Sequence, residues 1–156
     1  MITTTLTQLI ERDWEAVAAR LIATVRRHPD LQYLSNQSDL DHREWCRDLV
    51  ENLGNLMSAA KCEVVQRRLE ALGRIKCEEH VPLYEAVLRL QILKNEIVSF
   101  IHERELPMNT IQLYAEEEFE QRIARFFDEC IYRLVRGYEQ AIRLEQRTTR
   151  AMRAGG

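Results

Sequence analysis

The chain has 156 residues and a mass of 18.4 kDa, with 22 lysine and arginine residues against 25 aspartate and glutamate residues. A chain of this length fits a single domain, and a composition of 46% hydrophobic and 30% charged residues excludes a disordered chain. Only 5 glycines and 3 prolines interrupt it, which is too few for the turns of a β-sandwich or barrel. The net charge of −3 disfavours a nucleic-acid binder, because no basic field attracts a polyanion.

The sequence also predicts where the protein resides. No apolar run approaches the roughly 18 residues that a membrane-spanning helix needs, and the first five residues lack the basic and apolar regions of a signal peptide. We therefore expect a cytoplasmic protein without a membrane partner. The cysteines are widely spaced and form no CxxC motif, so we expect free thiols at Cys46, Cys62, Cys77 and Cys130.

Apolar residues at steps of three and four predict about five amphipathic helices in an all-α bundle. The first helix covers about residues 5–27, with Thr5 and Gln8 as a capping box and Pro29 as the stop signal. Residues 29–38 are predicted to form a loop. The inward-facing residues of this first helix are predicted to be Leu6, Ile10, Trp14, Val17, Leu21 and Val25.

Three further helices are predicted before the last one. The second begins after Ser38 or Asp39, and because of Gly54 the pattern does not determine the residue at which it ends. Ser58 is a candidate cap for the third, which runs to about Glu79. The fourth begins at Pro82, a residue suited to the first helical turn because its missing N–H is no loss there.

The last predicted helix is the longest, from Asn109 to about Arg150, with Asn109 and Gln112 as its cap. At 1.5 Å per residue, some 40 residues would extend about 60 Å, twice the width of a small domain. Either the helix breaks near Gly137 or its end projects beyond the bundle. Residues 143–156 carry four arginines against one glutamate, so we expect a helical domain over 1–142 and a basic tail or linker to a following output domain over 143–156.

Two pairs of residues at helical spacing would together supply a tetrahedral Cys₂His₂ set for zinc: His42 with Cys46, and Cys77 with His80. Neither spacing is that of a zinc knuckle, and free cysteine is often a small buried hydrophobe. The run of Glu116, Glu117, Glu118 and Glu120 covers several helix faces, so by itself it forms no convergent metal cup. We expect no metal.

Catalytic motifs are absent from the sequence. There is no GxSxG elbow, glycine-rich phosphate loop or HExxH motif, and no histidine follows a glutamate by three residues as in di-iron bundles. We therefore expect no enzymatic activity and no cofactor. His80 and His102 are weak candidates for a haem ligand.

Residues 65–101 carry a resemblance to a known family. Within them, residues 81–85 (VPLYE) precede an amphipathic helix that contains VLRLQIL at 87–93. This pattern resembles the N-terminal domain of the RsbRD type of RsbT co-antagonists, and the likeness extends loosely over most of the chain. The family tends to place glycine before the VPL stretch, where this chain has His80, a residue type that tolerates the left-handed conformation better than most.

The resemblance implies a bundle that is globin-like without haem and a domain that dimerises, with no catalytic residues. It also implies a sensory or regulatory role ahead of an output module in a bacterial signalling protein, either a stressosome-like regulator of a sigma-factor pathway or a histidine kinase. We expect the last helix to carry the dimer or signal surface, with candidate residues Phe127, Ile131, Leu134, Val135 and Tyr138.

Two alternatives remain open. One is a haem or small-molecule sensor with a pocket formed by Trp14, Trp45, Phe100, His102 and Phe126, which are equally good core residues. The other is a protein-interaction module that presents exposed apolar residues of the last helix, namely Tyr132, Val135 and Tyr138.

Overall fold

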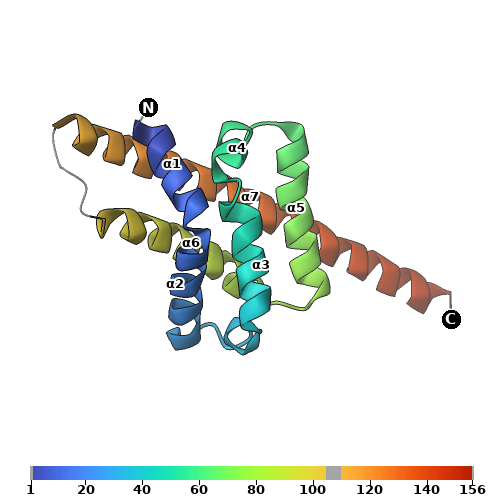
Figure 1. Ribbon diagram of the computed structural model, residues 1–156. Coiled ribbons are helices and arrows are strands. Elements are labelled where there is room, and N and C mark those ends of the chain that lie inside the picture. Colours follow the sequence, from blue (N-terminus) through green and yellow to red (C-terminus); the bar gives the residue numbers. More distant parts are fainter. Residues whose placement is uncertain (1, 105–109, 156) are drawn as a thin grey trace.

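Helices form the framework of the computed structural model, which describes residues 2–104 and 110–155 (Figure 1). Over these residues the chain forms seven α-helices, one short 3₁₀-helix and no strand, which confirms the all-α prediction. The helices are α1 (Ile2–Arg12), α2 (Trp14–Arg27), η1 (Leu34–Asn36), α3 (Asp39–Val50), α4 (Leu53–Ser58), α5 (Glu63–Glu78), α6 (Leu83–His102) and α7 (Thr110–Ala154).

The count exceeds the predicted five because two predicted helices are each divided. Asp13, with φ −99° and ψ 26°, separates α1 from α2, although the apolar stripe continues across the break. The predicted capping box at Thr5 and Gln8 is wrong, because α1 already begins at Ile2. The end at Arg27, before Pro29, is confirmed.

The second division falls after Val50. Asn52, with φ −116° and ψ 32°, leaves the helical region, and the short helix α4 follows. Ser58 is the last residue of α4 and does not cap the third predicted helix; Cys62 occupies that position before α5. Asparagine favours such breaks because its side chain competes for backbone hydrogen bonds.

The predicted start of α3 is confirmed in detail. The Ser38 hydroxyl accepts a hydrogen bond from the Asp41 backbone N–H at 3.1 Å, which satisfies one donor of the first helical turn. Pro82 stands immediately before the first residue of α6, where its missing N–H removes no helical hydrogen bond.

His80 ends α5 in the left-handed conformation, with φ 63°. The His80 N–H donates to the Cys77 carbonyl and the Val81 N–H donates to the Lys76 carbonyl, both at 3.0 Å. These two bonds are those of a Schellman motif, in which glycine usually holds the left-handed position. The expectation that histidine sustains this turn is confirmed.

The α5–α7 crossing is formed by two glycines. A Cβ atom placed on Gly73 would lie 2.1 Å from the Leu134 carbonyl oxygen, and one placed on Gly137 would lie 1.9 Å from the Glu70 carbonyl oxygen. The two backbones therefore touch with no side chain between them. Of the two predicted outcomes for Gly137, a helix break does not occur, because α7 continues through this position.

The helix α7 has 45 residues, a length of about 68 Å at 1.5 Å per residue. Its central part contacts α5 and α6, and it also contacts α1 and α4. Residues 143–155 are exposed, and in Figure 1 the red C-terminal end of α7 extends past α5. The predicted projection beyond the bundle is thus the outcome observed. The predicted cap residue Asn109 and the side chain of Gln112 lie outside the described residues.

One large apolar core joins all seven helices, from Leu6 in α1 to Leu134 in α7. A smaller cluster of Cys77, Tyr138 and Ala141 extends it between α5 and α7. Among the described residues, no helix combines the length and the apolarity needed to cross a lipid bilayer.

Candidate functional site

The five candidate residues of the last helix do not share one environment. Phe127, Leu134 and Tyr138 are buried in the chain's own core, whereas Ile131 and Val135 are half-buried. The Tyr138 hydroxyl donates a hydrogen bond to the Val81 carbonyl at 2.5 Å, and burial raises the pKa of this phenol. The hypothesis that Tyr138 is exposed is therefore wrong, because its ring fills the end of the α5–α7 contact.

Outward-facing apolar side chains lie beside these residues, between α6 and α7. They border two open depressions of about 870 Å³ and 550 Å³ that share Val135. Tyr84 and Tyr132 are more than half exposed. We call this surface the α6–α7 face, and it consists of Leu83, Tyr84, Val87, Leu88, Tyr132 and Val135. An exposed apolar patch of this kind is typical of a protein-interaction surface.

Charged residues surround the α6–α7 face. Asp30 lines the larger depression, and Arg136, Glu139 and Arg143 line the smaller one. Both signs of charge are thus present on the rim. A surface with both signs can pair with itself across a two-fold axis, because an acidic group on one copy then meets a basic group on the other.

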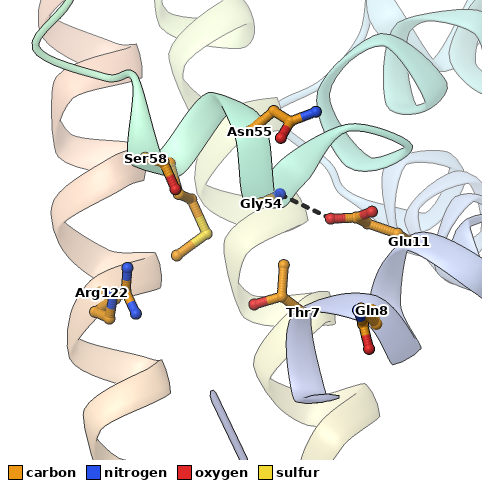
Figure 2. Close-up of a pocket in the computed structure, with 8 residues that line it drawn as sticks. Thr7, Gln8, Glu11, Gly54, Asn55, Ser58 and Arg122 are labelled. Carbon is orange, nitrogen blue, oxygen red and sulfur yellow. Dashed lines mark hydrogen bonds between the residues drawn. The ribbon is translucent and has the colours of Figure 1, made fainter. Parts of the chain in front are cut away.

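A separate polar depression of about 320 Å³ lies where α1, α4 and α7 meet (Figure 2). The Glu11 carboxylate accepts a hydrogen bond from the Gly54 N–H at 2.8 Å. This N–H belongs to the first turn of α4 and has no partner within the helix, so Glu11 joins α1 to α4. The lining residues are Thr7, Gln8, Glu11, Gly54, Asn55, Met57, Ser58 and Arg122.

An adjoining depression of about 380 Å³ shares Met57, Ser58 and Arg122 with the first and adds Lys61 and Arg125. Three cationic side chains thus border one hollow of the surface. Glu129 lines the same depression, so the charge of its lining is positive by two, which favours a small anion such as a carboxylate or phosphate over a cation.

His102 and two glutamates form the one group of three in the described chain whose potential metal-ligand atoms converge, within 4.8 Å of one another. Its Nε2 contacts Glu120 Oε1 and lies 3.3 Å from Glu116 Oε1. One imidazole and two carboxylates are donors that Zn²⁺ accepts, but direct polar contact between the His102 ring and the two carboxylates explains the same geometry. The sequence pattern missed this group because His102 comes from α6 and the glutamates from α7.

The five residues predicted to form a ligand pocket line no common depression among those found on the described chain. Arginines cover three of the rings, and Phe126 packs edge-on against Phe127 with ring centroids 5.4 Å apart. Phe126 lines the depression of about 380 Å³ described above, and His102 lines a different, open depression together with Glu116, Glu117 and Glu120. The arginine–ring pairs are Arg43 and Arg47 on Trp14, Arg89 on Trp45, and Arg104 on Phe100.

The four residues weighed for zinc also do not converge among the described residues. His42 is buried and uses both ring nitrogens in contacts with protein groups, whereas His80 is exposed on the turn after α5. Burial raises the pKa of the Cys46 thiol to about 12, and burial also raises the pKa of the Cys77 thiol. Both cysteines thus have the properties of buried apolar residues.

Two buried charged residues of α6 were missed by the sequence pattern, Glu85 and Arg89, each 1% exposed. The Glu85 carboxylate accepts hydrogen bonds from the backbone N–H groups of Tyr33 and Leu34, both at 3.0 Å, and so fixes the loop between α2 and α3. The available signal was their spacing, since they stand four residues apart within a largely apolar stretch and thus share one helix face.

Comparisons of the chain with models of known protein families, with curated proteins and with solved structures find no match. The likeness to the RsbRD-type domain and the globin-like form of the bundle stay predictions.

Proposed function

We propose that the chain is a non-catalytic, cytoplasmic regulatory domain of a bacterial signalling protein, which self-associates and passes a signal along α7. The observation that carries this proposal is the form of α7. Its middle is fixed in the core at the glycine crossing, whereas residues 143–155 are exposed on all sides. A polar helix that leaves a bundle commonly bridges domains.

The resemblance of residues 65–101 supports the same proposal. The VPLYE stretch stands at the start of α6, and His80 adopts the left-handed conformation that the family's glycine would supply. An RsbRD-type input domain would act ahead of a STAS or histidine kinase module. The full gene sequence tests whether this chain is such an input domain. A STAS or histidine kinase module encoded after Gly156 supports the proposal, and an unrelated enzyme encoded there contradicts it.

The α6–α7 face is the surface that we propose for self-association. It combines two exposed tyrosines with half-buried aliphatic side chains, and charges of both signs border it. Because it includes Tyr132 and Val135 of α7, a second copy bound there would contact the helix that leaves the domain.

Light scattering on the purified chain at high micromolar concentration tests the dimer. We expect the mass of two chains for the unaltered protein and of one chain for the double variant Val87→Glu with Val135→Glu. Both side chains are half-buried, so unchanged far-ultraviolet circular dichroism must accompany the change in mass. Leu144→Glu, on the exposed end of α7, is the matched control and should leave the dimer intact. A monomeric unaltered protein rejects self-association, and a dimeric double variant rejects this face.

A further inference from the structure

The core contains a cation without a carboxylate partner. Arg89 is 1% exposed, and its guanidinium forms no ion pair with any carboxylate in the described chain. Its guanidinium carbon lies 4.0 Å from the centroid of the Trp45 ring, its Nη1 lies 3.3 Å from His42 Nδ1, and its Nε has no hydrogen-bond partner. Burial lowers the pKa of Arg89 to about 10, so the side chain stays charged near neutral pH.

The contacts of His42 determine which of its nitrogens carries a hydrogen. Nε2 lies 2.8 Å from the Leu34 carbonyl oxygen, which can only accept, so Nε2 must be the donor. Nδ1 faces Arg89, which can only donate, so Nδ1 must be the acceptor. Both bonds are satisfied only by neutral His42 with its hydrogen on Nε2.

A second proton on His42 would have no favourable position. It would turn Nδ1 into a donor that faces the Arg89 donor at 3.3 Å, with both side chains removed from water. Burial first, and Arg89 in addition, lower the pKa of His42 below its ordinary value of 6.5.

The charged groups around this pair offer little compensation. On α6, the Glu85 carboxylate is already held by the two backbone N–H groups of the α2–α3 loop. On α2, Arg26 adds a further positive charge, which disfavours protonation. Asp39 and Asp41 on α3 and Glu79 after α5 are exposed, so water screens their attraction.

We propose that His42 and Arg89 form a pH-sensitive latch between α3 and α6, which holds while His42 is neutral and opens when His42 is protonated. The backbone of α3 lies mainly against α2 and α4, and that of α6 mainly against α7 and α2, so Arg89 joins α3 and α6 through its long side chain, by its contacts with His42 and Trp45. Below pH 6.5, His42 is protonated in the unfolded chain, whereas His42 in the closed latch stays neutral until the pH reaches its lowered pKa. The folded form therefore loses stability as the pH falls from 6.5 toward the lowered pKa of His42. This latch acts independently of the proposed dimer.

Urea unfolding of the full chain at pH values from 7.5 to 5.5 tests the latch. We expect the unfolding equilibrium constant to rise by up to about tenfold per pH unit below pH 6.5. The variant His42→Gln, which keeps a donor toward Leu34 but cannot be protonated, should lose this rise. The variant Arg89→Met should reduce it, because the repelling cation is removed. His80→Asn is the matched control and should keep it, since His80 is exposed and asparagine tolerates φ 63°.

Trp45 reports the opening directly, because the Arg89 guanidinium covers its ring. In the variant Trp14→Phe, which leaves Trp45 as the single tryptophan, the fluorescence of the folded protein should change below pH 6.5 as His42 is protonated, and adding His42→Gln should abolish the change. Equal pH dependence with and without His42→Gln, in either measurement, overturns the latch.

A nuclear magnetic resonance measurement on the unaltered protein applies even if the His42 variant does not fold. Nitrogen-15 spectra of the imidazole should show the hydrogen on Nε2 and a titration below pH 6.5. A His42 that carries its hydrogen on Nδ1, or that titrates at 6.5 or above, overturns the proposal.

Discussion

The α5–α7 crossing and the α3–α6 latch join two pairs of helices by opposite means. At the crossing, Gly73 and Gly137 bring the two backbones into direct contact, and beside them the Glu70 carboxylate of α5 pairs with Arg133 of α7 at 2.9 Å. At the latch, the long side chain of Arg89 reaches across to Trp45 and His42. We expect the first junction to be most sensitive to added volume at the two glycines, and the second to be most sensitive to the charge on His42.

The largest expected effect is at the crossing. Gly137→Ala places a Cβ atom 1.9 Å from the Glu70 carbonyl oxygen, so the helices must separate. We expect a loss of about 3 kcal/mol or more in the free energy of unfolding, with no dependence on pH between 5.5 and 7.5. Urea unfolding followed by circular dichroism measures it.

Gly155→Ala, just past the end of α7, is the control for the added methyl group, because the nearest atom to its Cβ lies 3.5 Å away in ordinary contact. We expect a change within about 0.5 kcal/mol. Equal effects of the two substitutions would show that close approach at Gly137 does not matter.

A smaller loss is expected beside the latch, for Glu85→Ala. The substitution leaves the buried Leu34 N–H and the neighbouring Tyr33 N–H without their acceptor, and an unsatisfied buried group costs about 1–3 kcal/mol. We expect a loss of about 2 kcal/mol and faster hydrogen exchange at these two amides. Glu85→Gln keeps one acceptor oxygen and should lose less; a larger loss for glutamine than for alanine would contradict this account.

A gain in stability is expected just beyond the crossing, at the end of α5. His80 holds φ 63°, which glycine adopts without strain. We expect His80→Gly to stabilise the fold by about 0.5–1 kcal/mol, measured as a higher urea midpoint with an unchanged slope. Val81 and Cys77 adjoin this turn. A loss of stability in His80→Gly would contradict this prediction and would indicate that the His80 imidazole makes a stabilising contact with such neighbours.

The smallest effect is expected at the far end of α7. Residues 143–155 are exposed and lie outside both hydrophobic clusters. A chain shortened to residues 1–142 should therefore unfold within about 0.5 kcal/mol of the full chain. A markedly larger loss would mean that these turns stabilise the crossing.

The sequence predicted those parts of the fold that local chemistry determines. The Ser38 cap and the stop before Pro29 each depend on a few neighbouring residues, and both are confirmed, while α6 begins one residue after the predicted Pro82. The sequence pattern missed the break at Asp13 because the apolar stripe continues through it. The two helices are distinguished by how each packs in the folded structure, which the pattern does not show.

The rest depends on contacts between distant segments. Gly137 has the same propensity whether it breaks a helix or admits the backbone of α5, and only the position of Glu70 decides between these outcomes. Tyr138 was expected at the surface because the pattern cannot show that Cys77 and Val81 cover it. The partners of Arg89 and His102 likewise come from other helices.

The contact at Gly137 also determines how α7 can move. The backbone of α7 lies directly on that of α5 at this position, so a tilt of the helix about Gly137 would keep this contact while displacing the exposed residues 143–155. From Gly137 to Ala154 the helix extends about 26 Å at 1.5 Å per residue. By simple geometry a tilt of about 10° would displace its tip by about 4–5 Å, close to one helical turn. The Gly73–Gly137 contact would then be the pivot about which α7 tilts.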